Sequence, residues 1–368
     1  MLETLSRLVG AGFGRRDAAL SIPIMDGALK PNNQLEEAPV FAEREGLEDL
    51  AIGADGQLYA AAGTGVFRVT GDGRFEPLAS YDRAVSALAV APDGTLAAGL
   101  GNAVRWGVGT AAEREVAAAP GAQGFVAVGA LHVRADGGLL IADASALHPG
   151  PQWRHDLMGQ GRSGRVLAHD PRSGATSVLA SGLAHAFGAC ADPQGRVVVS
   201  EAWRHRLTLL APDRPAAPAL TALPGYPARI APARGGGFWL SVFACRTQLV
   251  EFVLREHAYR REMMRSIEPR YWVAPAFSSG ADFLEPLQGG GVKQMGILKP
   301  WAPPRSYGLV VRLGADFVPK YSLHSRVGGR HHGIVAAAQR GDELFVLSKG
   351  SGRILRLSVE QASRGAAA

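Results

Sequence analysis

The stretch Ala54-Asp55-Gly56-Gln57-Leu58-Tyr59 joins a short turn to an apolar strand, and the chain repeats this unit five more times. The Gly in each turn supplies the positive φ that a tight hairpin requires, and the apolar residues after it form a strand that neighbouring sheets can bury. The other copies occupy residues 92–96, 135–140, 193–197, 235–239 and 340–345. Repeats of this kind are typical of a β-propeller with one copy in each blade. The sequence therefore predicts an all-β fold, a six-bladed β-propeller.

The spacing of the turns divides the chain into blades and insertions. Consecutive turns lie about forty residues apart in the first three blades, and the spacing lengthens between blades 3 and 4 and more than doubles between blades 5 and 6. The first excess is a polar loop over residues 145–163, and the second is an insertion in blade 5 over residues 243–306. We expect an N-terminal extension (1–27), one propeller (28–359) and a C-terminal tail (360–368), because blades are stable only when they pack on one another.

The blade 5 insertion contains a predicted helix over residues 247–266. Apolar residues such as Leu249, Phe252 and Met263 lie on one side of this helix and basic residues on the other, and Pro269 ends it. Three roles are open for the insertion: a cap over the channel, a docking element for an acidic membrane surface, or packing on the flank of the blade.

Composition argues against several classes of protein. The net charge is +6, but the basic residues are scattered and not interleaved with aromatic residues, so we expect no nucleic-acid partner. Cys190 and Cys245 are too few for a disulfide framework, and no apolar run reaches the ~18 residues of a membrane span. Residues 1–13 place Leu at helical spacing but lack the apolar core of a signal peptide. We expect a cytoplasmic protein, with residues 1–13 or 247–266 as candidate segments for peripheral membrane contact.

Five segments carry a resemblance to a known family. They follow one another in the family's order and are residues 28–35 (ALKPNNQL), 46–59, 164–202, 225–242 and 307–313 (YGLVVRL). Over residues 28–357 the sequence resembles the strictosidine synthase-like family, which includes the adipocyte plasma-membrane-associated proteins, and more distantly the gluconolactonases and paraoxonases. The resemblance implies a six-bladed propeller. Family members include a Pictet–Spengler synthase, and the relatives include esterases and lactonases that use a central divalent metal.

The repeat also predicts which residue of each blade faces the axis. Counting back eleven residues from an equivalent strand position gives Glu48, Ser86, Gly129, Phe187, Ala228 and Ile334. In the metal-dependent relatives this ring supplies carboxylate and Asn oxygens to a calcium-like ion, and calcium requires six or more oxygen ligands. Here only Glu48, with Asp49 beside it, retains that character, and Arg229 brings a positive charge. We therefore expect no metal, no cofactor and no central calcium, and a Glu48/Asp49–Arg229 ion pair in the channel instead.

The catalytic Glu of the synthase lies, by the resemblance, in the inner strand of blade 6. Val335 stands closest to that position in this chain. Because no carboxylate is present there to remove an amine proton, strictosidine synthesis is not expected.

A cluster of ionisable residues precedes the same strand, over residues 324–333 (HSRVGGRHHG). We place this loop on the channel face, with His185 of blade 4 at the equivalent level. Four uses are open. The His pair could bind a transition metal or act as general base for water attacking an ester or lactone, with Arg stabilising the oxyanion. The Arg and His residues could instead bind a carboxylate or phosphate, or the loop could be purely structural. Asp143 and Glu201, at strand ends in blades 3 and 4, would either orient a His or cap a turn.

These observations define the candidate site. The candidate catalytic bases are His332, His331 and His185. The candidate ligand-binding residues are Arg229, Arg326, Arg330, His324, Glu48, Asp49 and Phe187. The sequence favours a hydrolase of a small ester or lactone that works without the family's calcium. The alternative is a non-catalytic propeller that binds a small anionic or apolar ligand, or a protein partner, under the cap.

Overall fold

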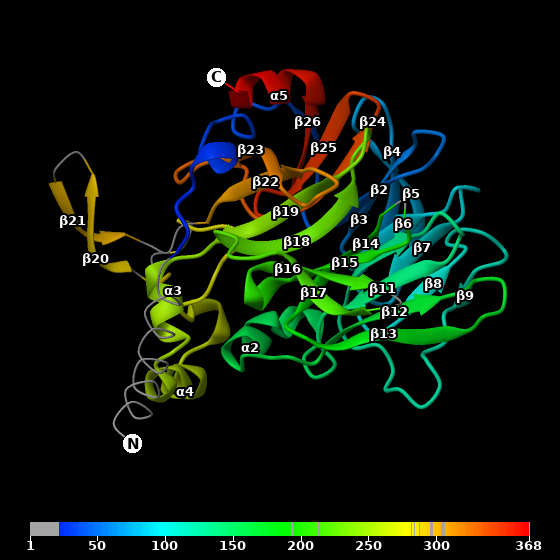
Figure 1. The fold of residues 1–368 in the computed structure, drawn as a ribbon, viewed down its shortest axis with the longest axis horizontal. Coiled ribbons are helices and arrows are strands. Elements are labelled where there is room, and N and C mark those ends of the chain that lie inside the picture. The colour runs from blue at the N-terminus through cyan, green and yellow to red at the C-terminus, as the bar shows by residue number, and fades with distance from the viewer. Residues whose placement is uncertain are drawn as a thin grey trace.

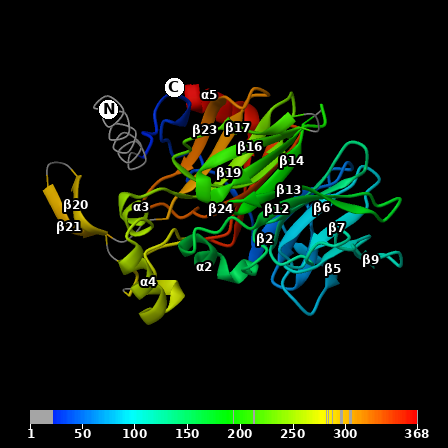
Figure 2. The same ribbon diagram turned by 60° about the horizontal axis from the view of Figure 1, so that its bottom comes forward.

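The structure is a ring of six four-stranded antiparallel sheets, which confirms the predicted six-bladed β-propeller (Figure 1 and Figure 2). The computed structural model describes residues 22–192, 194–211, 214–280, 282, 284–286, 288–294, 297–302 and 306–367. The first strands of the six blades contact one another in a closed cycle and so form the wall of the central channel.

Blades 1 to 3 each follow a simple up-and-down order, from the inner strand to the outer one. Blade 1 consists of β2 (Leu47–Ile52), β3 (Leu58–Ala62), β4 (Gly65–Val69) and β5 (Phe75–Ser80). Blade 2 consists of β6 (Ala87–Val90), β7 (Leu96–Gly99), β8 (Val104–Trp106) and β9 (Arg114–Glu115). Blade 3 consists of β10 (Val128–Val133), β11 (Leu139–Asp143), β12 (Gly164–His169) and β13 (Thr176–Leu183).

Blades 4 and 5 keep this order, whereas blade 6 takes its outer strand from the other end of the chain. Blade 4 consists of β14 (Ala186–Ala191), β15 (Val197–Glu201), β16 (Arg206–Ala211) and β17 (Arg214–Leu220). Blade 5 consists of β18 (Gly225–Pro232), β19 (Phe238–Cys245), β22 (Gly308–Leu313) and β23 (Pro319–Ser325). Blade 6 consists of β24 (Ile334–Arg340), β25 (Glu343–Ser348), β26 (Arg353–Ser358) and β1 (Val40–Glu43).

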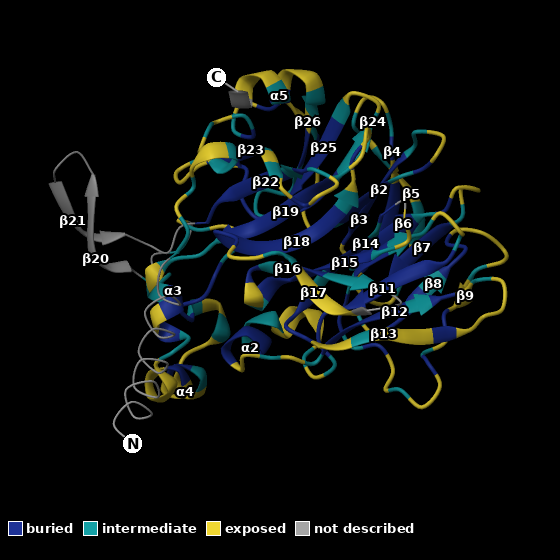
Figure 3. Ribbon diagram, in the orientation of Figure 1, coloured by how far each residue is buried: buried dark blue, intermediate teal, exposed yellow. Residues whose placement is uncertain are grey.

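The repeated turn joins the first strand of each blade to the second, as the sequence predicts. Gly56 and Gly94, at two of these turns, have φ values of +81° and +86°, which residues with a Cβ adopt only at a cost. The strand after the turn is the most deeply buried one: every residue of β3, β11 and β15 is buried. Outer strands such as β13 are largely exposed (Figure 3). The core therefore consists of apolar layers between adjacent blades.

Ring closure depends on the two ends of the propeller chain. β1 pairs with β26 in antiparallel register, with Val40 opposite Leu355 and Glu43 opposite Arg353. Residues just before β1 also cover β23 of blade 5, where the Leu35 N–H donates to the His324 carbonyl at 3.0 Å. The predicted C-terminal tail is instead largely helical, since α5 (Val359–Ala367) packs against β23 and β26. The segment 1–13 lies outside the described residues.

Both predicted insertions contain more secondary structure than expected. The loop 145–163 holds η2 (Gly150–Gln152) and α2 (Trp153–Met158). The single helix predicted over residues 247–266 is two helices, because the chain breaks at Leu254 to Glu256. The insertion comprises α3 (Gln248–Val253), α4 (His257–Ser266), η4 (Pro269–Tyr271), β20 (Gln288–Gln294) and β21 (Ile297–Ala302). Two short 3₁₀ helices lie outside the insertions: η1 (Gly27–Leu29) precedes the first strand, and η3 (Ala202–Arg204) follows β15.

The insertion packs on the propeller against α2, which lies in the loop between β11 and β12 of blade 3. Met263 of α4 and Trp272 after it belong to one buried apolar cluster with Leu157 and Met158 of α2. None of the described helices has both the length and the apolarity needed to cross a bilayer. Of the roles left open, packing on the propeller is therefore observed.

Candidate active site

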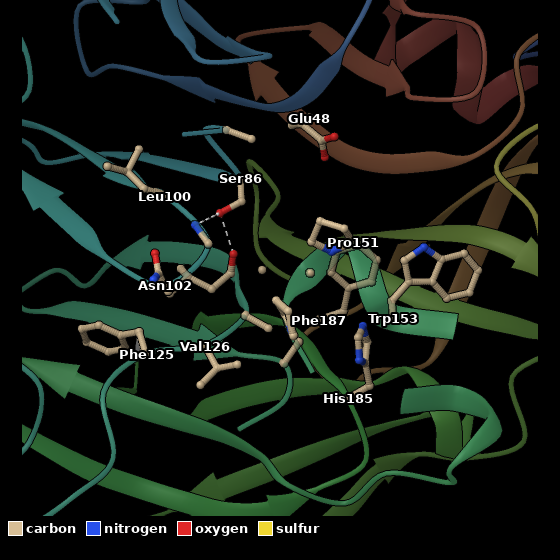
Figure 4. Close-up of a pocket in the computed structure, with 18 of the residues that line it drawn as sticks. Glu48, Ser86, Leu100, Asn102, Phe125, Val126, Pro151, Trp153, His185 and Phe187 are labelled. Atoms are coloured by element: carbon tan, nitrogen blue, oxygen red, sulfur yellow. Dashed lines mark hydrogen bonds between the residues drawn. The ribbon is translucent and has the colours of Figure 1, made fainter. Parts of the chain in front are cut away.

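A cavity of about 950 Å³ opens at one end of the channel, where the inner strands begin (Figure 4). Glu48, Ser86, Gly129 and Phe187 line it, as the axial count from the sequence predicts. Three of these four residues sit at an irregularity in strand pairing, and a β-bulge of this kind redirects a side chain. Similar bulges thus deliver side chains from several blades to one place.

The axial count is wrong by one residue in blades 5 and 6. In blade 5 the pairing skips from Pro227 to Ile230, and in blade 6 it skips Val335. Arg229, not Ala228, therefore lines the cavity. Ile334 is fully buried among the apolar residues packed around blade 6. The count failed because it assumed the same bulge position in every blade.

The guanidinium of Arg229 lies across the channel axis. Nη1 donates to the Glu48 carbonyl at 3.0 Å and to the Val335 carbonyl at 3.4 Å, and Nη2 donates to the Ser86 carbonyl at 2.7 Å. Nε lies 3.3 Å from Asp49 Oδ2. One side chain of blade 5 thereby connects the backbone of blades 1, 2 and 6.

The predicted ion pair is correct for Asp49 and wrong for the side chain of Glu48. Asp49 accepts hydrogen bonds from the backbone N–H groups of Leu50 and Leu88, both at 2.8 Å. Burial raises the pKa of Asp49 to about 6, although Arg229 acts in the opposite direction. The Glu48 carboxylate instead pairs with Lys349, whose Nζ lies 2.6 Å from Oε2. A second cavity of about 260 Å³ lies beyond Arg229, and Asp49 lines that one.

These residues do not fit a central calcium ion. The axis holds a fixed positive charge, which donates to the carbonyl oxygens that would otherwise face a cation. The nearby carboxylates of Asp49 and Glu48 are each engaged by a basic side chain. Within the described part of the chain no three His, Cys, Asp or Glu residues group closely enough to hold a metal.

His185 stands directly before β14 with a strained backbone. Its φ is +59°, a left-handed conformation that costs a residue with a Cβ about 1 to 2 kcal/mol. The backbone is fixed on both sides, because its N–H donates to the Leu183 carbonyl and its carbonyl accepts from the Ala202 N–H, both at 3.1 Å. Strain held in place by neighbours in this way is frequent at functional sites.

Asp156 of α2 orients the imidazole of His185. His185 Nδ1 lies 3.2 Å from Asp156 Oδ2, and because an ionised carboxylate only accepts hydrogen bonds, Nδ1 carries the proton. The hydrogen bond to Asp156 involves Nδ1 and leaves Nε2 available, and His185 lines the cavity (Figure 4). In the neutral ring this atom is a free base.

The Asp156 carboxylate is itself held in place. It accepts hydrogen bonds from Ser145 Oγ at 2.9 Å and from Trp203 Nε1 at 2.7 Å. Burial alone would raise the pKa of Asp156, but these bonds and the one from His185 hold it below its usual value. The ring of His185 also stacks on Trp203, with centroids 4.1 Å apart. Asp156 is thus ionised and rigid, as a residue that positions a base must be.

Two similar clamps hold the loops that carry the cavity wall. In blade 4, Glu201 accepts from the Ala184 N–H at 2.9 Å, next to His185, and pairs with Arg206. In blade 3, Asp143 accepts from the Ala127 N–H at 2.6 Å and pairs with Arg165 at 2.8 Å. Of the two roles open for these acids, Asp143 caps a turn, and Glu201 fixes the backbone beside a His.

Five aromatic side chains form the cavity wall around and beside His185. They meet edge to face or tilted: the ring of Phe277 lies 5.6 Å from Trp153 and 5.3 Å from Phe243, and Phe187 lies 5.7 Å from Phe243. Trp203 completes the group. Phe277 comes from the blade 5 insertion, so this insertion contributes directly to the cavity.

The other predicted His residues lie elsewhere. His332 is buried between Ser306 Oγ, 2.7 Å from Nδ1, and the Arg326 carbonyl, 3.0 Å from Nε2. His331 is also buried, and its N–H donates to Ser325 Oγ at 3.3 Å. Neither residue lines the cavity. His331 and His332 are predicted bases that the structure does not bring to the cavity.

His324, Arg326 and Arg330 lie at the outer side of blade 5. His324 belongs to the outer strand β23 and is buried, not on the channel face as expected. Arg326 Nε donates to Asn33 Oδ1 at 2.8 Å, and Arg330 pairs with Glu36 at 3.1 Å. These bonds fasten the segment before β1. Burial alone would raise the pKa of Glu36, but hydrogen bonds from Arg330 and Ser325 lower it to about 2.

Sequence reasoning missed several residues of the cavity. Asp156, Trp203, Phe243, Phe277 and Lys349 were not among the predicted site residues. Asp156 and Phe277 lie in the two insertions that interrupt the repeat, and the excess length of those insertions was the only sequence signal for them.

The comparisons with known proteins agree at the level of the fold. No family model and no curated protein matches the chain. Among solved structures, the chain is similar to a gluconolactonase from Xanthomonas campestris, with 15% identity, 87% of this chain and 88% of that one covered, and a TM-score of 0.57. It is also similar to a luciferin-regenerating enzyme, with 12% identity, 88% of this chain and 93% of that one covered, and a TM-score of 0.51. A third similar structure is the PQQ-bound aldose sugar dehydrogenase from Streptomyces coelicolor, with 14% identity, 87% of this chain and 96% of that one covered, and a TM-score of 0.51. The chain thus shares its fold with gluconolactonase-like six-bladed propellers.

Proposed function

We propose that this protein is a hydrolase of the strictosidine synthase-like group that cleaves an ester or lactone in the cavity without a central metal. The observation that carries this proposal is the pair of His185 and Asp156. Asp156 fixes Nδ1 of the imidazole at 3.2 Å, and Nε2 faces a largely aromatic cavity. A His oriented by a buried carboxylate is the usual arrangement of a general base.

The reaction needs only water and the residues present. Nε2 of His185 takes a proton from a water molecule, whose oxygen attacks the carbonyl carbon and forms a tetrahedral intermediate with a negative oxygen. When the C–O bond to the leaving group breaks, the imidazolium returns the proton to the departing alkoxide. The products are a carboxylic acid and an alcohol, joined in one molecule when the substrate is a lactone.

Lys349 is the candidate to stabilise the negative oxygen. Its ammonium group has three N–H donors, of which Glu48 accepts at least one, and it lies over the ring of Phe277 at 4.8 Å from the centroid. A charged donor in a cavity with aromatic walls is worth more than the same donor in water. Glu48 and Lys349 therefore have a role that does not depend on a metal.

The test is a hydrolysis screen with phenyl acetate and simple γ- and δ-lactones. We expect His185→Ala to lower kcat by about 10²- to 10⁴-fold, and Asp156→Asn by at least tenfold, with little change in folding. His332→Ala tests the rival base. If that variant loses activity while His185→Ala retains it, or if the wild-type protein has no activity on any substrate in the screen, the proposal is wrong.

A second candidate function is binding without turnover, and one observation favours it. Most polar groups of the cavity are already paired inside the protein, since Arg229 serves three backbone carbonyls and Glu48 is paired with Lys349. In this case a small apolar ligand would bind in the cavity and remain unchanged. Recovery of intact ligand after prolonged incubation would distinguish this function from hydrolysis.

A further inference from the structure

Apart from His185 Nε2 and Lys349, which the proposed reaction uses, several polar side chains in the cavity wall are already engaged within the protein. Ser86 Oγ donates to the Val128 carbonyl at 2.7 Å and accepts from the Gly101 N–H at 3.0 Å. Arg83 is engaged by Asp82 at 3.0 Å and by Asn102 at 2.9 Å. A ligand with many hydroxyl groups would lose its bonds to water on entering and gain few in return, which is unfavourable.

The aromatic residues offer the largest uncommitted surface. Trp153 lies 5.9 Å from Phe243 and 6.2 Å from Trp203, with interplanar angles of 77° and 33°. Aromatic rings prefer edge-to-face and offset contacts at centroid distances of about 4.5 to 7 Å. A flat ring system entering between these side chains would find such contacts on several sides.

The backbone of Phe277 packs closely against two Gly residues of blade 6, Gly333 and Gly350. A Cβ added at Gly350 would lie 2.1 Å from the Phe277 carbonyl oxygen, and one added at Gly333 would lie 2.9 Å from its Cα. Both distances are shorter than any allowed contact, so the two Gly residues leave room for the backbone of the insertion. The position of Phe277 is therefore built into the junction between blades 5 and 6.

We infer that the ligand of this cavity carries a planar apolar ring system, and that Phe277 is a specificity-determining residue that contacts it. The inference rests on the proposed function for the identity of the reactive group, but not for the identity of the ring. The volume of about 950 Å³ accommodates such a group and falls within the range of small-molecule sites.

The test is a binding measurement that needs no turnover. The probe is 2-acetonaphthone, a planar ketone that cannot be hydrolysed, titrated into the full-length protein by isothermal calorimetry. Glucose, which has no ester to cleave, is the polar comparison. We expect saturable binding of one ketone molecule, at least tenfold tighter than that of the sugar. Equal or weaker binding of the ketone would overturn the inference.

Variants connect this binding to Phe277. Phe277→Leu keeps the apolar volume but removes the flat face, so affinity for 2-acetonaphthone should fall about three- to tenfold. Gly350→Ala should weaken binding as well, because it displaces the Phe277 backbone without altering the ring. Phe252→Leu is the matched control: Phe252 lies in the same insertion, is 53% exposed and does not line the cavity, so its affinity should stay at the wild-type value. Unchanged affinity in Phe277→Leu would refute the role of Phe277.

The inference about the ligand class and the proposal of hydrolysis can be refuted independently of each other. 2-Naphthyl acetate has the same ring system attached to a cleavable ester. Tight ketone binding without hydrolysis of this ester would leave the inference standing and refute the proposed hydrolase. Hydrolysis of small aliphatic lactones without ketone binding would do the reverse.

Discussion

Arg229 Nη2 donates to the Ser86 carbonyl oxygen at 2.7 Å, so that a side chain of blade 5 bonds the backbone of blade 2 across the channel. The same guanidinium lies beside the buried carboxylate of Asp49. The guanidinium of Arg229 thus connects the inner strands of blades 1, 2 and 6 to blade 5.

Replacement of Arg229 by Met should therefore destabilise the fold strongly. The change leaves Asp49 as a buried charge without its partner, and breaking a buried pair costs about 3 to 5 kcal/mol. Urea unfolding measures the loss. The variant Arg229→Met/Asp49→Asn should recover part of it, whereas Arg261→Met, at an exposed position on α4, should change stability by less than about 0.5 kcal/mol.

The same arrangement predicts how the protein responds to chelators. Because a fixed charge occupies the axis, EDTA and added calcium should leave both the thermal midpoint and the hydrolytic activity unchanged. Differential scanning fluorimetry with and without 5 mM chelator checks the first of these. A fall in midpoint with EDTA that calcium restores would contradict the proposal of a metal-free centre.

Two substitutions at His185 should separate backbone strain from chemistry. His185→Ala and His185→Gly both remove the imidazole and its bond to Asp156, but only Gly adopts the φ of +59° without strain. We expect the Gly variant to be more stable than the Ala variant by about 1 kcal/mol, while both are equally inactive. Equal stability of the two would show that the left-handed backbone relaxes when the His is removed.

The two acid–arginine clamps should affect different kinetic parameters. Glu201 holds the Ala184 amide beside His185, so Glu201→Gln should lower kcat by about tenfold with little change in KM. Asp143 holds the Ala127 amide next to the cavity wall, so Asp143→Asn should mainly raise KM. Glu262→Gln, an exposed change on α4, is the control, and an identical effect of both clamp variants on kcat and KM would argue for general destabilisation.

A buried His should make stability depend on pH. His324 lies between the Tyr307 hydroxyl, at 2.9 Å, and Ser322 Oγ, at 2.7 Å, and burial lowers its pKa from 6.5 to about 4. Between these values the unfolded chain binds more protons, so the contribution of neutral His324 is complete above pH 6.5 and is lost as the pH falls towards 4.

This contribution can be isolated by substitution. Lowering the pH from 7.5 to 5 should cost about 2 kcal/mol through His324 alone. In His324→Gln, the difference between unfolding free energies at the two pH values should shrink by that amount, although the variant is less stable overall. His257→Gln, on the exposed side of α4, should retain the wild-type pH dependence. No change in the slope for His324→Gln would mean that another group is responsible.

The blades could be predicted from sequence because each one repeats the same local signal. Gly56 and its equivalents impose a positive φ at a fixed distance from an apolar strand, and this requires no knowledge of distant contacts. Closure by β1 is different. Val40 and Leu355 pair across almost the whole chain, and nothing in the residues around Val40 marks that partner.

The candidate site was only partly predictable for a related reason. The axial count found Glu48 and Phe187 because their bulges fall at equivalent positions, and it missed Arg229 as the axial residue because blade 5 has a longer irregularity. His332 attracted attention as an ionisable residue in a Gly-rich loop, but its two ring nitrogens are satisfied by Ser306 and a backbone carbonyl. Such bonds depend on tertiary packing, which a list of residue types does not contain.

The pairing of β1 with β26 also sets an order for folding during synthesis. β1 is synthesised before the other strands of the propeller, but β26, the strand that completes its hydrogen bonds, follows all of them in the sequence. Five blades contain all their own strands in sequence and can form as the chain lengthens, whereas the sixth waits for Arg353 and the residues after it. A nascent chain arrested before this point would hold β1 as an unpaired strand and expose open sheet edges, which are prone to aggregate. Closure of the ring is therefore a late event that cannot begin before β26 has been synthesised.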